Sequence, residues 1–61
     1  MQRFILVVKG PNLNDVQTVE LLRMPVVGAP IETRFGTCIV TAAEPLPPGG
    51  EYAGRITCRL P

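Results

Sequence analysis

The sequence predicts a small α+β domain: a mixed three- to four-stranded sheet in β-α-β-β order, with one short helix and a long-looped β-hairpin at the end. Three observations carry this prediction. Residues 4–8 are apolar at every position, which is typical of a strand buried on both faces and central in its sheet. Residues 14–23 show apolar side chains three residues apart, as in an amphipathic helix. Residues 53–60 alternate between apolar and polar, as in a strand with one buried face.

The length of the chain indicates one domain spanning residues 1–61. A domain of this size buries only about 60% of the surface that its unfolded chain exposes. The composition is nevertheless apolar, with 46% hydrophobic and 18% charged residues, where about 25% charged is ordinary. We therefore expect the excess apolar side chains to contact a partner.

After the first strand, residues 10–12 (Gly-Pro-Asn) interrupt the apolar run. Asn12 or Asn14 can then cap a helix by accepting a hydrogen bond from a free backbone N–H in its first turn. The predicted helix is about ten residues long and ends at Pro25, because the residue before a proline avoids helical dihedrals. Its apolar stripe consists of Val16, Val19 and Leu22, widened by Leu21.

The second half of the chain is predicted to be extended. Residues 26–30 contain too much proline and glycine for a central strand, so they form a short edge strand or an extended connection. Residues 31–43 resemble one longer strand, with Gly36 as a candidate bulge. Residues 44–50 hold three prolines and two glycines and must form a stiff loop before the last strand.

A hairpin closed symmetrically about Pro48 would place Cys38 opposite Cys58. The pair could be a disulfide or redox pair, or two small hydrophobic side chains in a core. The core interpretation is favoured, because directly opposed strand cysteines are often badly placed for bridging and the expected compartment is reducing.

One helix can cover only one face of this sheet. Phe4, Leu6 and Val8 point opposite to Ile5 and Val7, so the first strand is apolar on both sides. The uncovered face requires either a curled sheet or a second subunit. We expect a homo-oligomer, either a dimer or a higher assembly of dimers.

Several functional classes are excluded or disfavoured. A net charge of +1 does not fit duplex nucleic-acid binding, and no apolar run approaches the roughly 18 residues that span a membrane, so a cytoplasmic location is expected. With no histidine and only two cysteines, a zinc site within one chain is almost excluded. With no histidine and no serine, neither a Ser-His nor a Cys-His nucleophile pair can form. We expect no enzyme activity, no metal and no cofactor.

The first candidate site runs from Lys9 through Asn12 to Asn14, at the predicted junction of strand and helix. Free N–H groups at a helix N-terminus favour an anion there; alternatively, the proline and asparagines only shape a turn and cap the helix. The segment Ile5–Asn14 resembles the start of type II dehydroquinases, which carry a hydrophobic strand followed by the same Gly-Pro-Asn-Leu-Asn run.

This resemblance implies that Asn12 contacts a polar ligand. That family, however, has a much longer flavodoxin-like domain and relies on a tyrosine shortly after the loop and on a later histidine. Here the only tyrosine is Tyr52 and histidine is absent, so the catalytic residues are missing.

The second candidate site consists of arginines. Arg55 and Arg59 share a face of the last strand, and Arg34 could join them from a neighbouring strand. Repeated in a symmetric oligomer, this strip could hold a phosphate-bearing ligand. The alternative is a solvated face whose charges discourage aggregation.

Two functions therefore stay open. The first is a non-catalytic binding module that acts as a homo-oligomer and captures a small anionic or nucleotide-like ligand. The second is a protein–protein interaction module, an accessory or inhibitor subunit that docks by its apolar sheet face or a strand edge.

Overall fold

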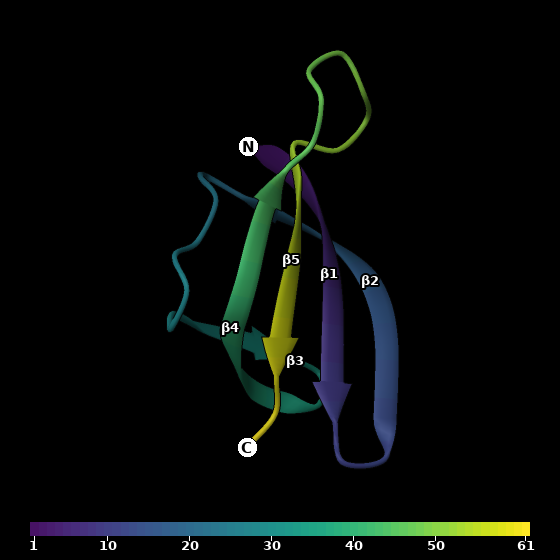
Figure 1. The fold of residues 1–61 in the computed structure, drawn as a ribbon, viewed down its shortest axis with the longest axis vertical. Helices are drawn as coiled ribbons and strands as arrows, with labels where there is room; N and C mark the ends of the chain where they lie inside the picture. The colour runs from purple at the N-terminus through teal and green to yellow at the C-terminus, as the bar shows by residue number, and fades with distance from the viewer.

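A computed structural model describes all residues 1–61, and it is all-β. Five strands form one sheet in the order β2-β1-β5-β4-β3, with β1 and β5 parallel and every other pair antiparallel (Figure 1). No helix is present, and hence none that could cross a bilayer. The predicted α+β fold is therefore wrong. The strands are β1 (Gln2–Gly10), β2 (Leu13–Leu21), β3 (Pro30–Thr33), β4 (Gly36–Pro45) and β5 (Gly54–Arg59).

The segment predicted as a helix is the edge strand β2. Gly10 pairs with Leu13 across a two-residue turn, and the antiparallel register continues without irregularity to Gln2 and Leu21. Pro11 presets the dihedral of the first turn position and Asn12 suits the second, so the chain can return at once along β1. The end of β1 therefore faces no helix N-terminus, and the helix-based argument for an anion at this loop does not hold.

The first strand is an interior strand of the sheet, between β2 and β5, as its continuous apolar run predicted. The chain reaches β3 through residues 22–29. In this connection, the Gly28 N–H donates to the Val40 carbonyl and the Val40 N–H donates to the Ala29 carbonyl, at 2.8 and 2.9 Å. Residues 26–29 form a tight turn, in which the Ala29 N–H donates to the Val26 carbonyl at 3.1 Å and Gly28 has a φ of +95°. The prediction of a short edge strand or an extended connection over these residues is therefore wrong, and the edge strand β3 begins at Pro30.

The predicted long strand over residues 31–43 is instead a hairpin of β3 and β4. Thr33 pairs with Gly36 across a tight turn, and Gly36 has a φ of +113°, a left-handed conformation that side chains rarely adopt. The Thr33 hydroxyl donates to the Gly36 carbonyl and accepts from the Phe35 N–H. The irregularity of β4 lies between Val40 and Ala42, and Gly36 is the turn residue.

The last two strands are antiparallel across the proline-rich loop, but their register differs from the predicted one. Cys58 lies opposite Val40, because the loop is not symmetric about Pro48 and β4 carries its bulge. Cys38 therefore sits diagonally from Cys58. Both are free, buried thiols.

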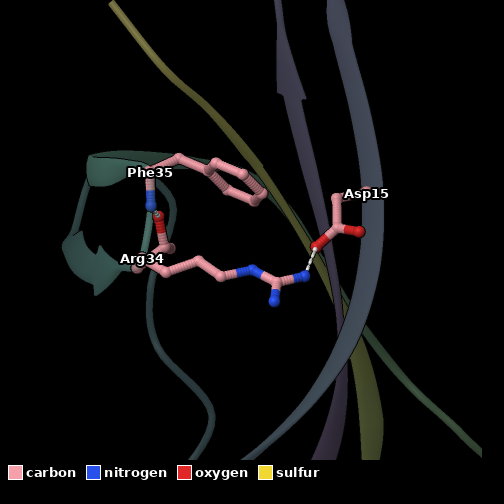
Figure 2. A network of polar contacts seen from close by, with 4 residues as sticks. Asp15, Arg34 and Phe35 are labelled. Atoms are coloured by element: carbon pink, nitrogen blue, oxygen red, sulfur yellow. Dashed lines mark hydrogen bonds and ion pairs between the residues drawn. The ribbon is translucent and has the colours of Figure 1, made fainter.

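The core lies on the inner face of a curled sheet. Arg34, in the turn between β3 and β4, reaches Asp15 on β2, with 3.2 Å between Nη2 and Oδ2 (Figure 2). This contact joins the two edges of the sheet, since β2 is one edge strand and the turn follows β3, the other. The sheet therefore curls and covers its own inner face. On the outer face, Ile5 and Val7 stay half-buried. The core side chains are Phe4, Leu6, Val8, Cys38, Val40, Ile56 and Cys58.

Candidate anion-binding site

Three of the predicted ligand residues form one row across three strands. Lys9 on β1 is the register partner of Arg59 on β5, and it is also the partner of Asn14 on β2. Neighbouring strands lie about 4.8 Å apart, so the three Cα atoms follow one another at that spacing. All three residues are exposed, on the face opposite to the core.

The two cations of this row have no acidic partner. The ion pairs of the chain use Arg3, Arg34 and Arg55, and neither Lys9 nor Arg59 contacts a carboxylate. Like charges directly opposite each other on a sheet repel. A bound anion would remove this repulsion, since the guanidinium fork can bind two oxygens while the ammonium adds a third donor.

The other predicted ligand residues lie elsewhere. Asn12 is exposed in the turn between β1 and β2, close to Asn14 in the chain. Arg55 shares the outer face of β5, but its Nη2 donates to Glu44 Oε1 at 2.8 Å. The hydrogen bond to Glu44, and secondly the charge of Glu44, raise the pKa of Arg55. Arg34 pairs with Asp15, which faces the inner side of the sheet (Figure 2). Arg34 and Arg55 are therefore already engaged.

Sequence reasoning did not include Ile39, which extends the row. It is the partner of Arg59 on β4 and is 39% exposed. The signal was present in the sequence, because Ile39 lies between the inward-facing Cys38 and Val40 and must therefore point outward. Ile39 thus adds an apolar side chain next to Arg59 at one end of the row.

The cavity of the protein lies at the other end of the sheet and has a volume of about 600 Å³. It is bounded by the proline-rich loop, the start of β1 and Glu20. Arg3 Nη2 lies 3.7 Å from Glu20 Oε2, and Arg3 Nη1 lies 3.5 Å from Glu51 Oε2. Because this cation is shared by two carboxylates, the cavity does not favour an anion. The protein also contains no group of three or more metal-ligating side chains.

The cysteines do not form a reactive site. Burial raises the pKa of Cys58 to about 12, with further contributions from the hydrogen bond to Cys38 and from its charge. The nucleophilic form of cysteine is the thiolate, so a buried thiol with this pKa is inert at neutral pH. The two side chains fill the core, the favoured interpretation of the sequence.

Neither a protein-family model nor a curated protein nor a solved structure matches the chain. The similarity of Ile5–Asn14 to type II dehydroquinases is thus restricted to a short segment. Here this segment forms β1, a tight turn and the first residues of β2, where the resemblance predicted a strand followed by a helix. It carries no argument for dehydroquinase activity.

Proposed function

We propose that the protein is a non-catalytic binding module that captures a small anionic ligand, such as a phosphate-bearing molecule, on the row formed by Asn14, Lys9 and Arg59. The observation that carries this proposal is the direct pairing of Lys9 with Arg59 in the parallel register, with no carboxylate beside either. The free thiols of the core support a reducing, cytoplasmic location.

The row offers complementary contacts to such a ligand. Arg59 supplies two parallel donors for phosphate oxygens, Lys9 a point charge, and the Asn14 amide a neutral donor. Ile39 lies beside Arg59 and can contact an apolar part of the ligand, such as the face of a base. Hydrogen bonds to charged groups contribute about 1.5–3 kcal/mol each, so two of them, about 3–6 kcal/mol together, correspond to a dissociation constant between roughly 6 mM and roughly 40 μM.

The test is an NMR titration of the full chain with pyrophosphate and with a nucleoside monophosphate at low ionic strength. We expect the amide signals of Lys9, Asn14 and Arg59 to shift together and saturate. Arg59→Ala should weaken binding about tenfold, which corresponds to the loss of one charged hydrogen bond of about 1.5 kcal/mol. Raising the salt concentration should weaken binding as well, because exposed charges are screened.

Arg23→Ala is the matched control. Arg23 is exposed, forms no ion pair and follows the end of β2 that pairs with Gln2, at the opposite end of the sheet. Equal losses of affinity in Arg59→Ala and Arg23→Ala would mean that the anion responds only to the net charge of the protein. If the amide signals of Lys9, Asn14 and Arg59 do not shift, the proposal is refuted.

A further inference from the structure

The strand β2 is the longer and the less protected of the two edges of the sheet. It is nine residues long, pairs only with β1 and contains no lysine, arginine, proline or bulge. The opposite edge, β3, has four residues and begins at Pro30. Natural sheets keep edges from pairing with other chains through short strands, prolines, bulges and charged side chains, including inward-pointing ones. Of these devices β2 has only its two acidic residues, Glu20 and the inward-facing Asp15, and Asp15 is paired with Arg34. Of the two edges, β2 is therefore the more open to a further strand.

The unpaired backbone groups of β2 can be assigned from the ladder. The carbonyls of Arg3 and Lys9 accept from Ala53 and Leu60, on the β5 side of β1. Successive residues of a strand direct their hydrogen bonds to opposite sides. The intervening residues of β1 therefore bond to β2.

This alternation fixes the outward groups of β2. Leu6, whose hydrogen bonds are directed to β2, is the register partner of Gln17, so the N–H and C=O of Gln17 are directed to β1. The neighbouring residues, Val16 and Thr18, direct theirs away from the sheet. Their side chains are exposed as well.

We propose that β2 pairs with β2 of a second copy of this chain, antiparallel and centred on Gln17, so that the sheet continues across a two-fold axis. In this register Val16 lies opposite Thr18 of the second copy, and each such pair exchanges both of its outward hydrogen bonds. The whole of Leu13–Leu21 overlaps with its copy. The proposal does not rest on the anion site, whose two cations lie on β1 and β5, and the two share only Asn14.

The charges of β2 favour the antiparallel direction over a parallel, in-register one. Its charged residues are both acidic, Asp15 and Glu20. Centring on Gln17 places Asp15 opposite Val19 of the second copy and Glu20 opposite Asn14 of the second copy. A parallel, in-register pair would instead place each carboxylate opposite its own copy, and like charges directly opposite are destabilising. Self-pairing is therefore compatible with the charge pattern in the antiparallel direction.

Gln17 supplies a second, independent observation. Its Nε2 is buried and has no hydrogen-bond partner within the chain, although buried polar groups are nearly always paired. At the two-fold axis the two Gln17 residues form a non-hydrogen-bonded pair, in which the Cα atoms approach to about 4.5 Å and side chains are closest. Because Nε2 is enclosed within the single chain, the Gln17 side chain must turn towards the axis before its amide nitrogen can donate to the Gln17 amide oxygen of the second copy.

The experiment combines mass and amide exchange on the full chain. Light scattering and sedimentation, from micromolar to millimolar concentration, should show the mass rising from monomer to dimer. Over the same range, amide hydrogen exchange at Val16 and Thr18 should slow, because these N–H groups gain a partner. The amides of Gln17 and Val19, already bonded to β1, should not change.

Two substitutions of exposed apolar side chains test the location. Val16→Lys places a charge on the β2 edge and should weaken dimerisation at least tenfold. Ile39→Lys is the matched control, because Ile39 is also an exposed strand residue of the outer face but lies on β4, away from this edge. Circular dichroism verifies that both variants keep the sheet, and a single exposed side chain should not affect it.

The outcomes are decisive. A monomer at every concentration refutes the proposal. A dimer in which exchange at Val16 and Thr18 is unchanged, or which Ile39→Lys disrupts as strongly as Val16→Lys, indicates association through the outer face and also refutes edge pairing. Loss of dimerisation only in Val16→Lys, together with slowed exchange at Thr18, supports it. Arg59→Ala, which tests the anion site, should leave the dimer intact.

Discussion

Gly54→Ala tests how the connection between β2 and β3 packs on the sheet. Gly54 begins β5 on the buried inner face, between Phe4 and Pro45 in the register. A Cβ atom at this position would overlap the terminal methyl of Met24 and lie 2.8 Å from the Glu44 carbonyl oxygen. Met24 is flexible and can move, but the carbonyl belongs to the backbone of β4 and cannot move without shifting the strand.

The expected cost follows from these contacts. Overpacking of a core costs about 1–3 kcal/mol, and replacing glycine by alanine returns about 0.4–1 kcal/mol through the unfolded chain. The net loss of unfolding free energy is therefore about 1–2 kcal/mol. For a domain of this size it lowers the melting temperature by roughly 4–16 °C. This is a large part of the total stability, which is about 3–9 kcal/mol at 0.05–0.15 kcal/mol per residue.

Urea unfolding followed by far-ultraviolet circular dichroism measures the change. Gly50→Ala is the control, because its Cβ would meet nothing closer than the Pro47 carbonyl oxygen at 3.8 Å, and it should be neutral or slightly stabilising. Combining Gly54→Ala with Met24→Ala should cost less than the sum of the two, because one of the overlaps is removed. If Gly54→Ala is as stable as the parent chain, Met24 and the connection do not cover Gly54.

Two further outcomes follow from the core and the turns. The Cys58 thiol has an ordinary pKa of 9.0 in the unfolded chain and a pKa of about 12 in the folded chain, so folding favours the protonated thiol. Its contribution to the free energy of unfolding is therefore complete below about pH 9 and is lost as the pH rises towards 12. Urea midpoints at about pH 8 and about pH 10 should therefore differ less in Cys58→Ala than in the parent chain, and equal differences would contradict the assignment. Gly36→Ala should cost about 1–2 kcal/mol in thermal melts, because alanine at a φ of +113° is strained; an unchanged melting temperature would mean that the turn has another conformation.

The sequence predicted the central strands because their signals are local. The apolar run of residues 4–8 and the alternation of residues 53–60 each correspond to one observed strand, β1 and β5. Both patterns arise because each residue of these strands is apolar or polar according to the face of the sheet on which it lies, and this can be read residue by residue. The parallel pairing of these strands, and hence the register of Lys9 with Arg59, depends on the order of strands in the sheet. Sequence reasoning singled out both cations: Lys9 for a helix N-terminus that the fold does not contain, and Arg59 for a face of the last strand that it does share with Arg55.

The strand β2 was predicted as a helix because two periods compete in it. Val16, Val19 and Leu22 fit a helical stripe, whereas the strand directs Asp15 and Gln17 to the inner face. Inward polar residues obscure the alternation that a strand normally shows. They are tolerated at the rim of the sheet, where Asp15 meets Arg34 from a turn 19 residues further along the chain. That partner comes from tertiary structure, so the propensity of the segment alone gave the wrong element.

The apolar excess of the composition can now be divided between two locations. The curl of the sheet encloses seven core side chains on the inner face and needs no second subunit to cover them. Among the large apolar residues that stay exposed, only Val16 and Ile39 belong to strands, and Val16 is the more exposed of the two, at 67% against 39%. Ile39 lies on an interior strand, where the backbone is already paired on both sides. Val16 has both an exposed side chain and backbone groups that no strand of the chain pairs with. The partner expected from the apolar composition therefore fits the edge of β2 better than a face of the sheet.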